Sequence, residues 1–209
     1  MSAWFVRSLL AAWLLCAGCL PAAASADDAL DGIRARLAQP AVLRGAFEQE
    51  KQLQGFRNPL RSRGTFLLVR DRGIAWDTRE PFASSAVLGR ERLVTTLPDG
   101  TTRVLLDATE SPATAAVNAL LLALVAGDLD ALAPQFELEG ALGDDGAWTL
   151  HLTPRPGPLQ RVFTGIDLAG DAHVREVRIA EAGGDTSTIR FADLAEAPAA
   201  DVAELARFD

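Results

Sequence analysis

Residues 64–82 read GTFLLVRDRGIAWDTREPF, which is the pattern of a β-hairpin. In its first arm Phe66, Leu68 and Arg70 share one face, and the residues between them, also apolar, share the other. An Asp-Arg-Gly triplet supplies the turn, and Trp76 lies on the returning arm. A strand that is apolar on both faces must be covered on both sides, by core, by a helix or by a ligand. The remaining chain is interpreted around this requirement.

The basic residue on the apolar face, Arg70, has two interpretations. It could reach past its apolar neighbours to the surface and pair with a carboxylate. Alternatively, it stands at the mouth of a cavity, where a guanidinium would meet an anionic head group or a ligand carbonyl. The pattern alone leaves both interpretations open.

The hairpin lies in a run of short strands without intervening helices, which predicts an antiparallel meander. Residues 55–63 form a turn-rich stretch with three arginines, Arg57, Arg61 and Arg63. This stretch is either a solvated loop or a docking patch. After one apolar helix, strands resume and continue to residue 191. The predicted strands are 41–54, 65–70, 74–78, 86–88, 93–97, 101–106, 135–139, 147–153, 162–168, 174–180 and 186–191.

Two longer helices are predicted. Residues 27–39 have apolar residues at helical spacing and are followed by a proline, which predicts a helix that ends there. This helix either packs on the core or acts as a mobile lid. Residues 113–126 follow Ser111, a good N-cap, and are apolar nearly all round, so this helix must be buried on most sides. It is either ordinary core or a plug in a cavity that a ligand can also occupy, with Leu121 and Leu124 lining that cavity. A short helix is expected after Pro198.

The composition suits one domain over residues 27–209, because 209 residues bury one sizeable core. The formal net charge is −8 and no basic stripe is present, which argues against nucleic acid as a partner. Residues 1–26 have the layout of a cleavable signal peptide, with cleavage before Asp27 or two residues earlier. A lipoprotein acylated at Cys19 is the alternative. Both cysteines lie in this segment, so we expect no disulfide in the mature protein.

No catalytic constellation is recognisable. The nucleophile elbow, the dinucleotide fingerprint and the Walker pattern are absent from the sequence. The two histidines, His151 and His173, have no cysteine or third histidine to complete a zinc site, so surface or structural roles are expected. We therefore expect a binding protein without metal or cofactor rather than an enzyme.

Taken in order, these features resemble the periplasmic outer-membrane lipoprotein carriers, the LolA-like proteins. The similarity comprises an early Phe-Glu-Gln strand at Phe47, the 64–76 hairpin with its Arg and Trp, a Leu-rich helix at 120–127, and the strands at 148–154 and 184–191. Two features depart from the family pattern: Arg70 is followed by Asp rather than Pro, and residues 93–100 contain no aromatic residue. The chain is therefore similar to a divergent member.

The resemblance implies a mainly β fold with some α-helix: an unclosed antiparallel β-barrel, or half-barrel, with an α-helical lid or plug. It implies a monomer that takes acyl chains into a hydrophobic concavity, receives them from an inner-membrane donor and passes them to an outer-membrane acceptor. Arg70 would help transfer the cargo and close the lid, with Phe66, Leu68 and Trp76 beside it in the cavity.

Three binding functions stay open on the sequence; an enzyme acting on a hydrophobic small molecule is a further alternative, against which the missing catalytic constellation counts. The first is a periplasmic carrier of lipoprotein acyl chains. The second is a carrier of another acylated molecule, such as a glycolipid or a lipid-like pigment precursor. The third is a lipid-sensing interaction domain that reports to a protein partner. Cargo bound to the purified protein would distinguish the carriers from the sensor.

Overall fold

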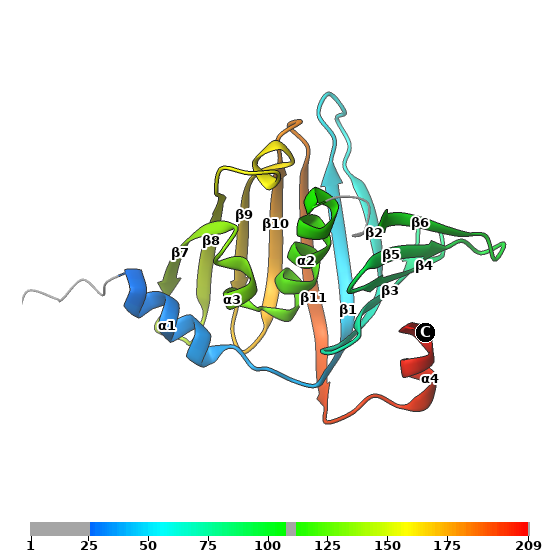
Figure 1. The fold of residues 1–209 in the computed structure, drawn as a ribbon, viewed down its shortest axis with the longest axis horizontal. Helices are drawn as coiled ribbons and strands as arrows, with labels where there is room; N and C mark the ends of the chain where they lie inside the picture. The colour runs from blue at the N-terminus through cyan, green and yellow to red at the C-terminus, as the bar shows by residue number, and fades with distance from the viewer. Residues whose placement is uncertain (1–25, 108–111, 209) are drawn as a thin grey trace, which may run out of the picture.

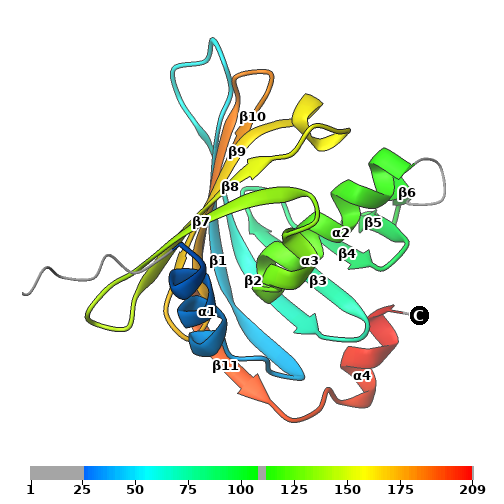
Figure 2. The same ribbon diagram turned by 60° about the vertical axis from the view of Figure 1, so that its left-hand side comes forward.

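The structure, a computed structural model, describes residues 26–107 and 112–208. Within these residues eleven strands form one antiparallel sheet that curves without closing, and helices lie in its concavity (Figure 1; Figure 2). This confirms the predicted unclosed half-barrel with helical elements. The predicted signal peptide and Ser111 lie outside the described residues, so neither prediction is tested.

The sheet consists of two meanders, which are joined by pairing between the first strand of the chain and the last. The strand order is β6-β5-β4-β3-β2-β1-β11-β10-β9-β8-β7, so the first strand pairs with the last. The strands of the first meander are β1 (Val42–Gln52), β2 (Leu60–Val69), β3 (Gly73–Glu80), β4 (Ser84–Gly89), β5 (Arg92–Thr96) and β6 (Thr102–Asp107). Those of the second are β7 (Phe136–Leu142), β8 (Trp148–Pro154), β9 (Phe163–Gly170), β10 (Val174–Glu181) and β11 (Thr186–Ala197).

The helices are α1 (Ala26–Arg36), α2 (Pro112–Ala126), α3 (Leu129–Leu132) and α4 (Val202–Leu205), with short 3₁₀ helices η1 (Leu159–Arg161) and η2 (Ala206–Phe208). Helix α1 packs against β7, where Gly140 leaves room for Ile33; a Cβ on that glycine would lie 2.6 Å from the Ile33 side chain. Helices α2 and α3 lie over the concave face of the sheet (Figure 2). None of the helices in the described residues is both long and apolar enough to cross a bilayer.

The prediction that β2 needs cover on both faces is confirmed. On the concave side Phe66 and Leu68 belong to the main hydrophobic cluster, which also contains much of α2. On the opposite side Leu67 and Val69 belong to a smaller cluster closed by residues of the C-terminal segment, among them Phe208. The two faces of one strand are thus buried by two different parts of the chain.

Salt bridges hold this C-terminal segment in place. The Arg44 guanidinium donates two hydrogen bonds of 2.6 Å to the Glu204 carboxylate, and Arg207 pairs with Asp77 at 2.6 Å. These bonds from Arg44 hold the pKa of the Glu204 carboxyl below its usual value. Asp201 and Glu204 also form a capping box at the start of α4.

Several predicted boundaries are wrong, among them those of α1, β2 and β11. Helix α1 ends at Arg36 rather than 39, because residues before a proline favour an extended backbone. Strand β2 begins at Leu60, so Arg61 and Arg63 lie on a strand and not in a loop. Both face carboxylates, with Arg61 3.1 Å from Glu50, and such opposite-charge pairs stabilise a sheet even where the sequence is polar.

Strand β11 is the third case, since it continues to Ala197 instead of ending at 191. Its register with β1 runs as far as the pair Val42–Ala197. The added length was not visible in the sequence because it depends on the partner strand. Helix α3, which the sequence analysis did not predict, is a single turn capped by Asp128.

Candidate functional site

The apolar residues predicted to line a cavity lie in one hydrophobic cluster on the concave face. Trp76 is half-buried, and its ring centroid lies 3.9 Å from that of Phe47 and 6.0 Å from those of Phe66 and Phe191. We call these four residues the aromatic cluster. Leu68 is buried in the same hydrophobic core.

The aromatic cluster depends on a glycine. Gly64 pairs with Phe47 across β1 and β2, and a Cβ there would lie 2.8 Å from the Phe47 ring and 1.9 Å from the Asp77 carbonyl oxygen. Any side chain at this position would therefore push β3 or the Phe47 ring away. The glycine that opens the quoted hairpin is what lets the rings approach.

Helix α2 occupies the concavity in this structure. Leu124 is buried and Leu121 is half-buried, and both belong to the hydrophobic cluster that contains the aromatic rings. Helix α2 carries no charged residue along its whole length, Pro112–Ala126. In this structure α2 therefore covers the aromatic cluster on the concave face, an arrangement that we call the closed form.

One polar side chain anchors α2. Asn118 is 1% exposed, and its Nδ2 donates hydrogen bonds to the backbone oxygens of Gly89 (2.9 Å) and Arg90 (2.8 Å) in the β4–β5 turn. Its Oδ1 is buried and has no hydrogen-bond partner among the described residues. A buried amide with one unsatisfied oxygen costs about 1–3 kcal/mol, so this anchor is both specific and weaker than a fully paired one.

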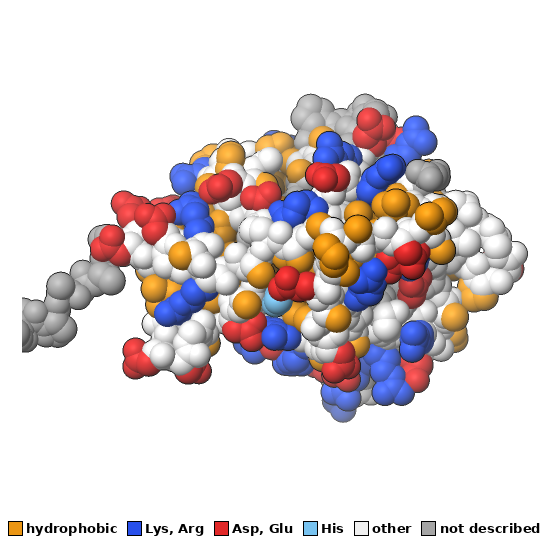
Figure 3. All heavy atoms as spheres, turned by 90° about the horizontal axis from the view of Figure 1, so that it is seen from below, with side chains coloured by type: hydrophobic (Ala, Val, Ile, Leu, Met, Phe, Trp, Pro, Cys, Tyr) orange, Lys and Arg blue, Asp and Glu red, His pale blue; other side chains and the backbone are white. Residues whose placement is uncertain are grey.

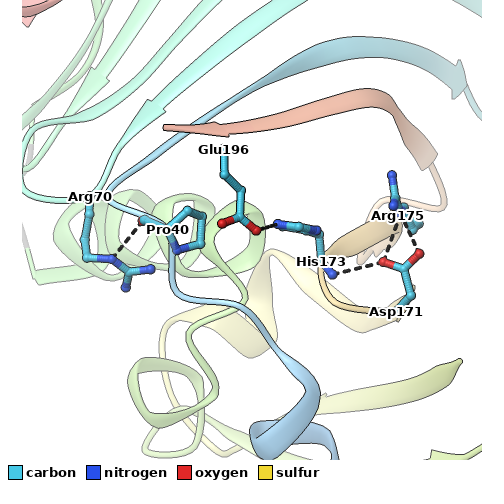
Figure 4. Close-up of polar contacts among 6 residues, drawn as sticks. All are labelled: Pro40, Arg70, Asp171, His173, Arg175 and Glu196. Carbon is cyan, nitrogen blue, oxygen red and sulfur yellow. Dashed lines mark hydrogen bonds and ion pairs between the residues drawn. The ribbon is translucent and has the colours of Figure 1, made fainter. Parts of the chain in front are cut away.

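Arg70 directly follows the last residue of β2, and its side chain is exposed. Its Nε donates to the Pro40 backbone oxygen at 3.1 Å (Figure 4). A second guanidinium nitrogen donates to the Gln39 side chain. The Arg70 backbone N–H also donates to the Ala41 oxygen at 3.0 Å. Arg70 thus holds residues 38–41, the segment between α1 and β1 that we call the strap.

The other end of the strap is bonded to the β9–β10 turn. The Ala38 N–H donates to the Ala172 oxygen at 2.7 Å. Beside it, Asp171 accepts from the His173 backbone and the Arg175 guanidinium, both at 3.0 Å (Figure 4). Burial opposes ionisation of Asp171, but these hydrogen bonds outweigh it and hold the pKa of its carboxyl below the usual value. The strap therefore links the lower ends of the two meanders.

A cavity of about 210 Å³ opens beside Arg70. Three arginines, Arg70, Arg72 and Arg90, line it together with Asp128. Its apolar wall comes from Leu68 and from one side of α2, through Ala119, Leu122, Ala123 and Ala126. We call this cavity the arginine pocket. Over the lower face as a whole, basic, acidic and hydrophobic side chains are interspersed (Figure 3).

Arg72 and Arg90 were not among the site residues predicted from the sequence. Both lie in turns of the first meander, and the antiparallel order of β2 to β5 places those turns at the same end of the sheet. The sequence did contain a pattern that could have identified them: in a meander every second turn lies at the same end of the sheet, and two such turns each contain one of these arginines.

The histidines pair with carboxylates. His151 Nδ1 lies 2.7 Å from Asp167 on an exposed part of the sheet, and His173 Nε2 lies 2.9 Å from Glu196 near the strap (Figure 4). Across the described ranges no group of three or more His, Cys, Asp or Glu side chains is placed to hold a metal ion. In this structure each histidine is therefore paired with a single carboxylate.

Comparison with known proteins gives one family match. Residues 39–204 match the model of the family described as outer membrane lipoprotein carrier protein LolA. No curated protein sequence shows significant similarity to the chain.

Several solved structures are similar at low identity. A LolA superfamily protein from Nitrosomonas europaea is 10% identical, with 86% of this chain and 96% of that one covered and a TM-score of 0.47. A DUF1329 family protein from Desulfovibrio piger is also 10% identical, with coverage of 88% and 99% and a TM-score of 0.49. A chain of the Pseudomonas aeruginosa MucA/MucB complex is 15% identical, with coverage of 86% and 60% and a TM-score of 0.43.

At these values the assignment rests on the family model, which spans the region from the strap to α4. That region contains the aromatic cluster, α2 and the arginine pocket. The chain belongs to the outer membrane lipoprotein carrier family, LolA.

Proposed function

We propose that this protein carries the acyl chains of a lipoprotein through the periplasm, from a donor at the inner membrane to an acceptor at the outer membrane. The observation that carries the proposal is α2: a helix without charged residues that fills the concave face of an unclosed sheet. Family membership supports a carrier or binding role rather than catalysis.

The physical reason for such a carrier is the cost of exposing acyl chains. Each methylene group moved from water to an apolar surface is worth about 0.8 kcal/mol, so an acylated cargo does not cross an aqueous space alone. The carrier must also release what it binds. A helix that exchanges places with the chains meets both needs, because the concave surface is covered in either state.

The contacts of α2 suit such an exchange. Leu121, Leu122 and Val125 are half-buried rather than fully enclosed. The polar anchor, Asn118, is a single side chain with an unsatisfied oxygen. The free energy that acyl chains must supply to displace the helix is therefore modest relative to full unfolding.

The test uses the fluorescence of Trp76 with lipopeptides whose acyl chains carry bromine, which quenches a nearby indole. Replacing Trp148, buried in the second meander, with Phe leaves Trp76 as the reporter within residues 27–209. We expect saturable quenching by brominated dipalmitoyl lipopeptide and none by the same peptide without acyl chains. Absence of quenching with the acylated peptide would contradict the proposed function.

A cross-linked control tests the exchange itself. Residues 27–209 contain no cysteine, so Asn118→Cys with Gly89→Cys can be joined by a cleavable thiol reagent that fixes α2 to the β4–β5 turn. We expect the cross-linked protein to exclude the lipopeptide and cleavage to restore binding. The single-cysteine variants, treated in the same way, serve as matched controls. Binding that persists in the cross-linked form would contradict displacement of α2.

The identity of the cargo is a separate measurement. Native mass spectrometry and lipid extraction on protein purified from its own periplasm would show what it holds. A bound lipoprotein supports the proposal in full. A glycolipid or another acylated small molecule would replace the lipoprotein as cargo and leave the carrier function in place.

A further inference from the structure

The arginine pocket contains three basic side chains, which a site for acyl chains alone does not need. On one side it is lined by Leu68 and the small apolar residues of α2; on the other it is lined by three guanidinium groups. Among the described residues, Asp128 supplies the only carboxylate in the lining, and its Oδ1 accepts a hydrogen bond from the Ala131 N–H at 3.1 Å. The lining therefore carries a formal excess of positive charge in a protein whose net charge is −8.

The charges of two of these arginines are poorly neutralised within the protein. Arg70 donates to a backbone oxygen and to an amide oxygen, both neutral acceptors. Arg90 lies 3.8 Å from Asp71, and both side chains are largely exposed, so this ion pair is weak. A guanidinium donates strongly to phosphate and carboxylate oxygens, and two can bind one such group.

We propose that the arginine pocket binds the anionic head group, a phosphate or carboxylate, of the acylated molecule that the protein carries. This inference rests on the carrier part of the proposed function and narrows the cargo to an acylated molecule with an anionic head group. The acylated cysteine of a lipoprotein has no ionised head group, so the inference favours another acylated molecule over a lipoprotein as cargo. The acyl part of the molecule would extend from the head group along the α2 wall into the concavity.

The size of the pocket fits this division. Pockets that enclose a whole small-molecule ligand measure about 300–1,000 Å³, whereas the arginine pocket measures about 210 Å³. In the closed form it can hold a head group and the beginning of a chain. The rest of the chain needs the space that α2 occupies, and Leu122 and Ala126 of that helix already form the pocket wall. Head-group binding can therefore precede displacement of the helix.

The experiment compares two probes with the same chain: dodecyl phosphate and dodecyl glucoside, each below its micellar concentration, measured by titration calorimetry. We expect dodecyl phosphate to bind at least about 10-fold more tightly, the effect of one charge-assisted hydrogen bond or more. The preference should fall as salt is raised, because the arginines are partly exposed.

The variant Arg72→Gln/Arg90→Gln tests the residues while leaving Arg70 on the strap. We expect the preference for phosphate to fall to within about 2-fold, with binding of the glucoside unchanged. The control Arg57→Gln/Arg161→Gln makes the same change of charge at exposed positions outside the pocket and should keep the preference. If the double variant fails to fold, Arg90→Gln alone is used. Asn118 of α2 bonds to the backbone oxygen of Arg90, and this substitution leaves the backbone oxygen in place.

The outcomes separate this inference from the proposed function. Equal affinity of the wild-type protein for the two probes would overturn the head-group site and leave the carrier function standing. Failure to bind either probe or the acylated lipopeptide would overturn both. Inorganic phosphate alone that binds as tightly as dodecyl phosphate would show a site for free anions and overturn the assignment to an acylated molecule.

Discussion

The anchor of α2 gives a prediction that separates helix docking from folding. Asn118→Asp keeps the size and shape of the side chain but replaces the NH₂ donor with an acceptor. The new carboxyl would face the backbone oxygens of Gly89 and Arg90, which now accept at 2.9 and 2.8 Å. At 1% exposure it would have almost no water to solvate it.

The magnitude follows from two limits. Two lost hydrogen bonds at about 1 kcal/mol each set a lower value of about 2 kcal/mol. Keeping the new carboxyl protonated at pH 7 costs about 1.4 kcal/mol for each of roughly three pH units above its usual pKa, so the upper value is about 4 kcal/mol. Undocking of α2 should therefore become about 30- to 1,000-fold more populated at pH 7.

The pH dependence has a definite sign. Docking raises the pKa of the introduced carboxyl, so the docked state binds more protons and is favoured by acid. The defect of Asn118→Asp should shrink as the pH falls from 7 towards about 4. Hydrogen exchange of the α2 amides measures the opening, and binding of brominated lipopeptide should be faster in the variant.

Asn58→Asp makes the same chemical change at an exposed position in the β1–β2 loop and should have no such effect. If α2 in Asn118→Asp exchanged no faster than in the wild-type protein, the anchor assignment would be wrong. If the whole sheet unfolded together with α2, the helix would be ordinary core rather than a separable element.

Three further changes test the surrounding structure. Arg70→Leu should keep the fold, lower the free energy of unfolding by about 1–2 kcal/mol through two lost hydrogen bonds, and alter cargo retention; unchanged transfer would remove Arg70 from the mechanism. Glu204→Gln keeps the capping box but removes the ion pair with Arg44. It should cost about 1 kcal/mol at pH 7. Because the pKa of Glu204 is lowered, the pair stabilises above the ordinary value of 4.5 and is lost as the pH falls, so variant and wild-type melting curves should converge in acid. Gly64→Ala should destabilise by at least about 2 kcal/mol, whereas Gly183→Ala, with open space around it, should lie within about 0.5 kcal/mol of the wild-type value.

Much of the fold could be predicted from local pattern. Period-two alternation and turn residues located every strand, and the two-sided apolar pattern of β2 indicated cover on both faces. Strand and helix ends were less accurate. The ends of β2 and β11 depend on hydrogen bonds to β1, and β1 is far from β11 in the sequence. Local residues therefore carry little information about where these strands end.

The candidate site divides in the same way. The sequence singled out Arg70, the aromatic hairpin and the leucines of α2, because each is an unusual residue in its own segment. Their roles were open: α2 as core or plug, and Arg70 at the surface or at a cavity mouth. Local sequence cannot decide these alternatives, because each depends on residues from another part of the chain.

The sequence by itself determined the antiparallel meander, the need to cover β2 twice and the apolar nature of α2, since these follow from side-chain periodicity and turn residues; the half-barrel was implied by the family resemblance. Only the tertiary structure decided which elements of the chain cover which apolar surfaces. It placed α2 over the aromatic cluster, joined Asn118 to the β4–β5 turn and bound Arg70 to the strap. It also brought Arg72 and Arg90 together beside α2. The reason is geometric: hairpin turns that are separate in the chain share one end of a sheet, so their side chains meet only once the strands have paired.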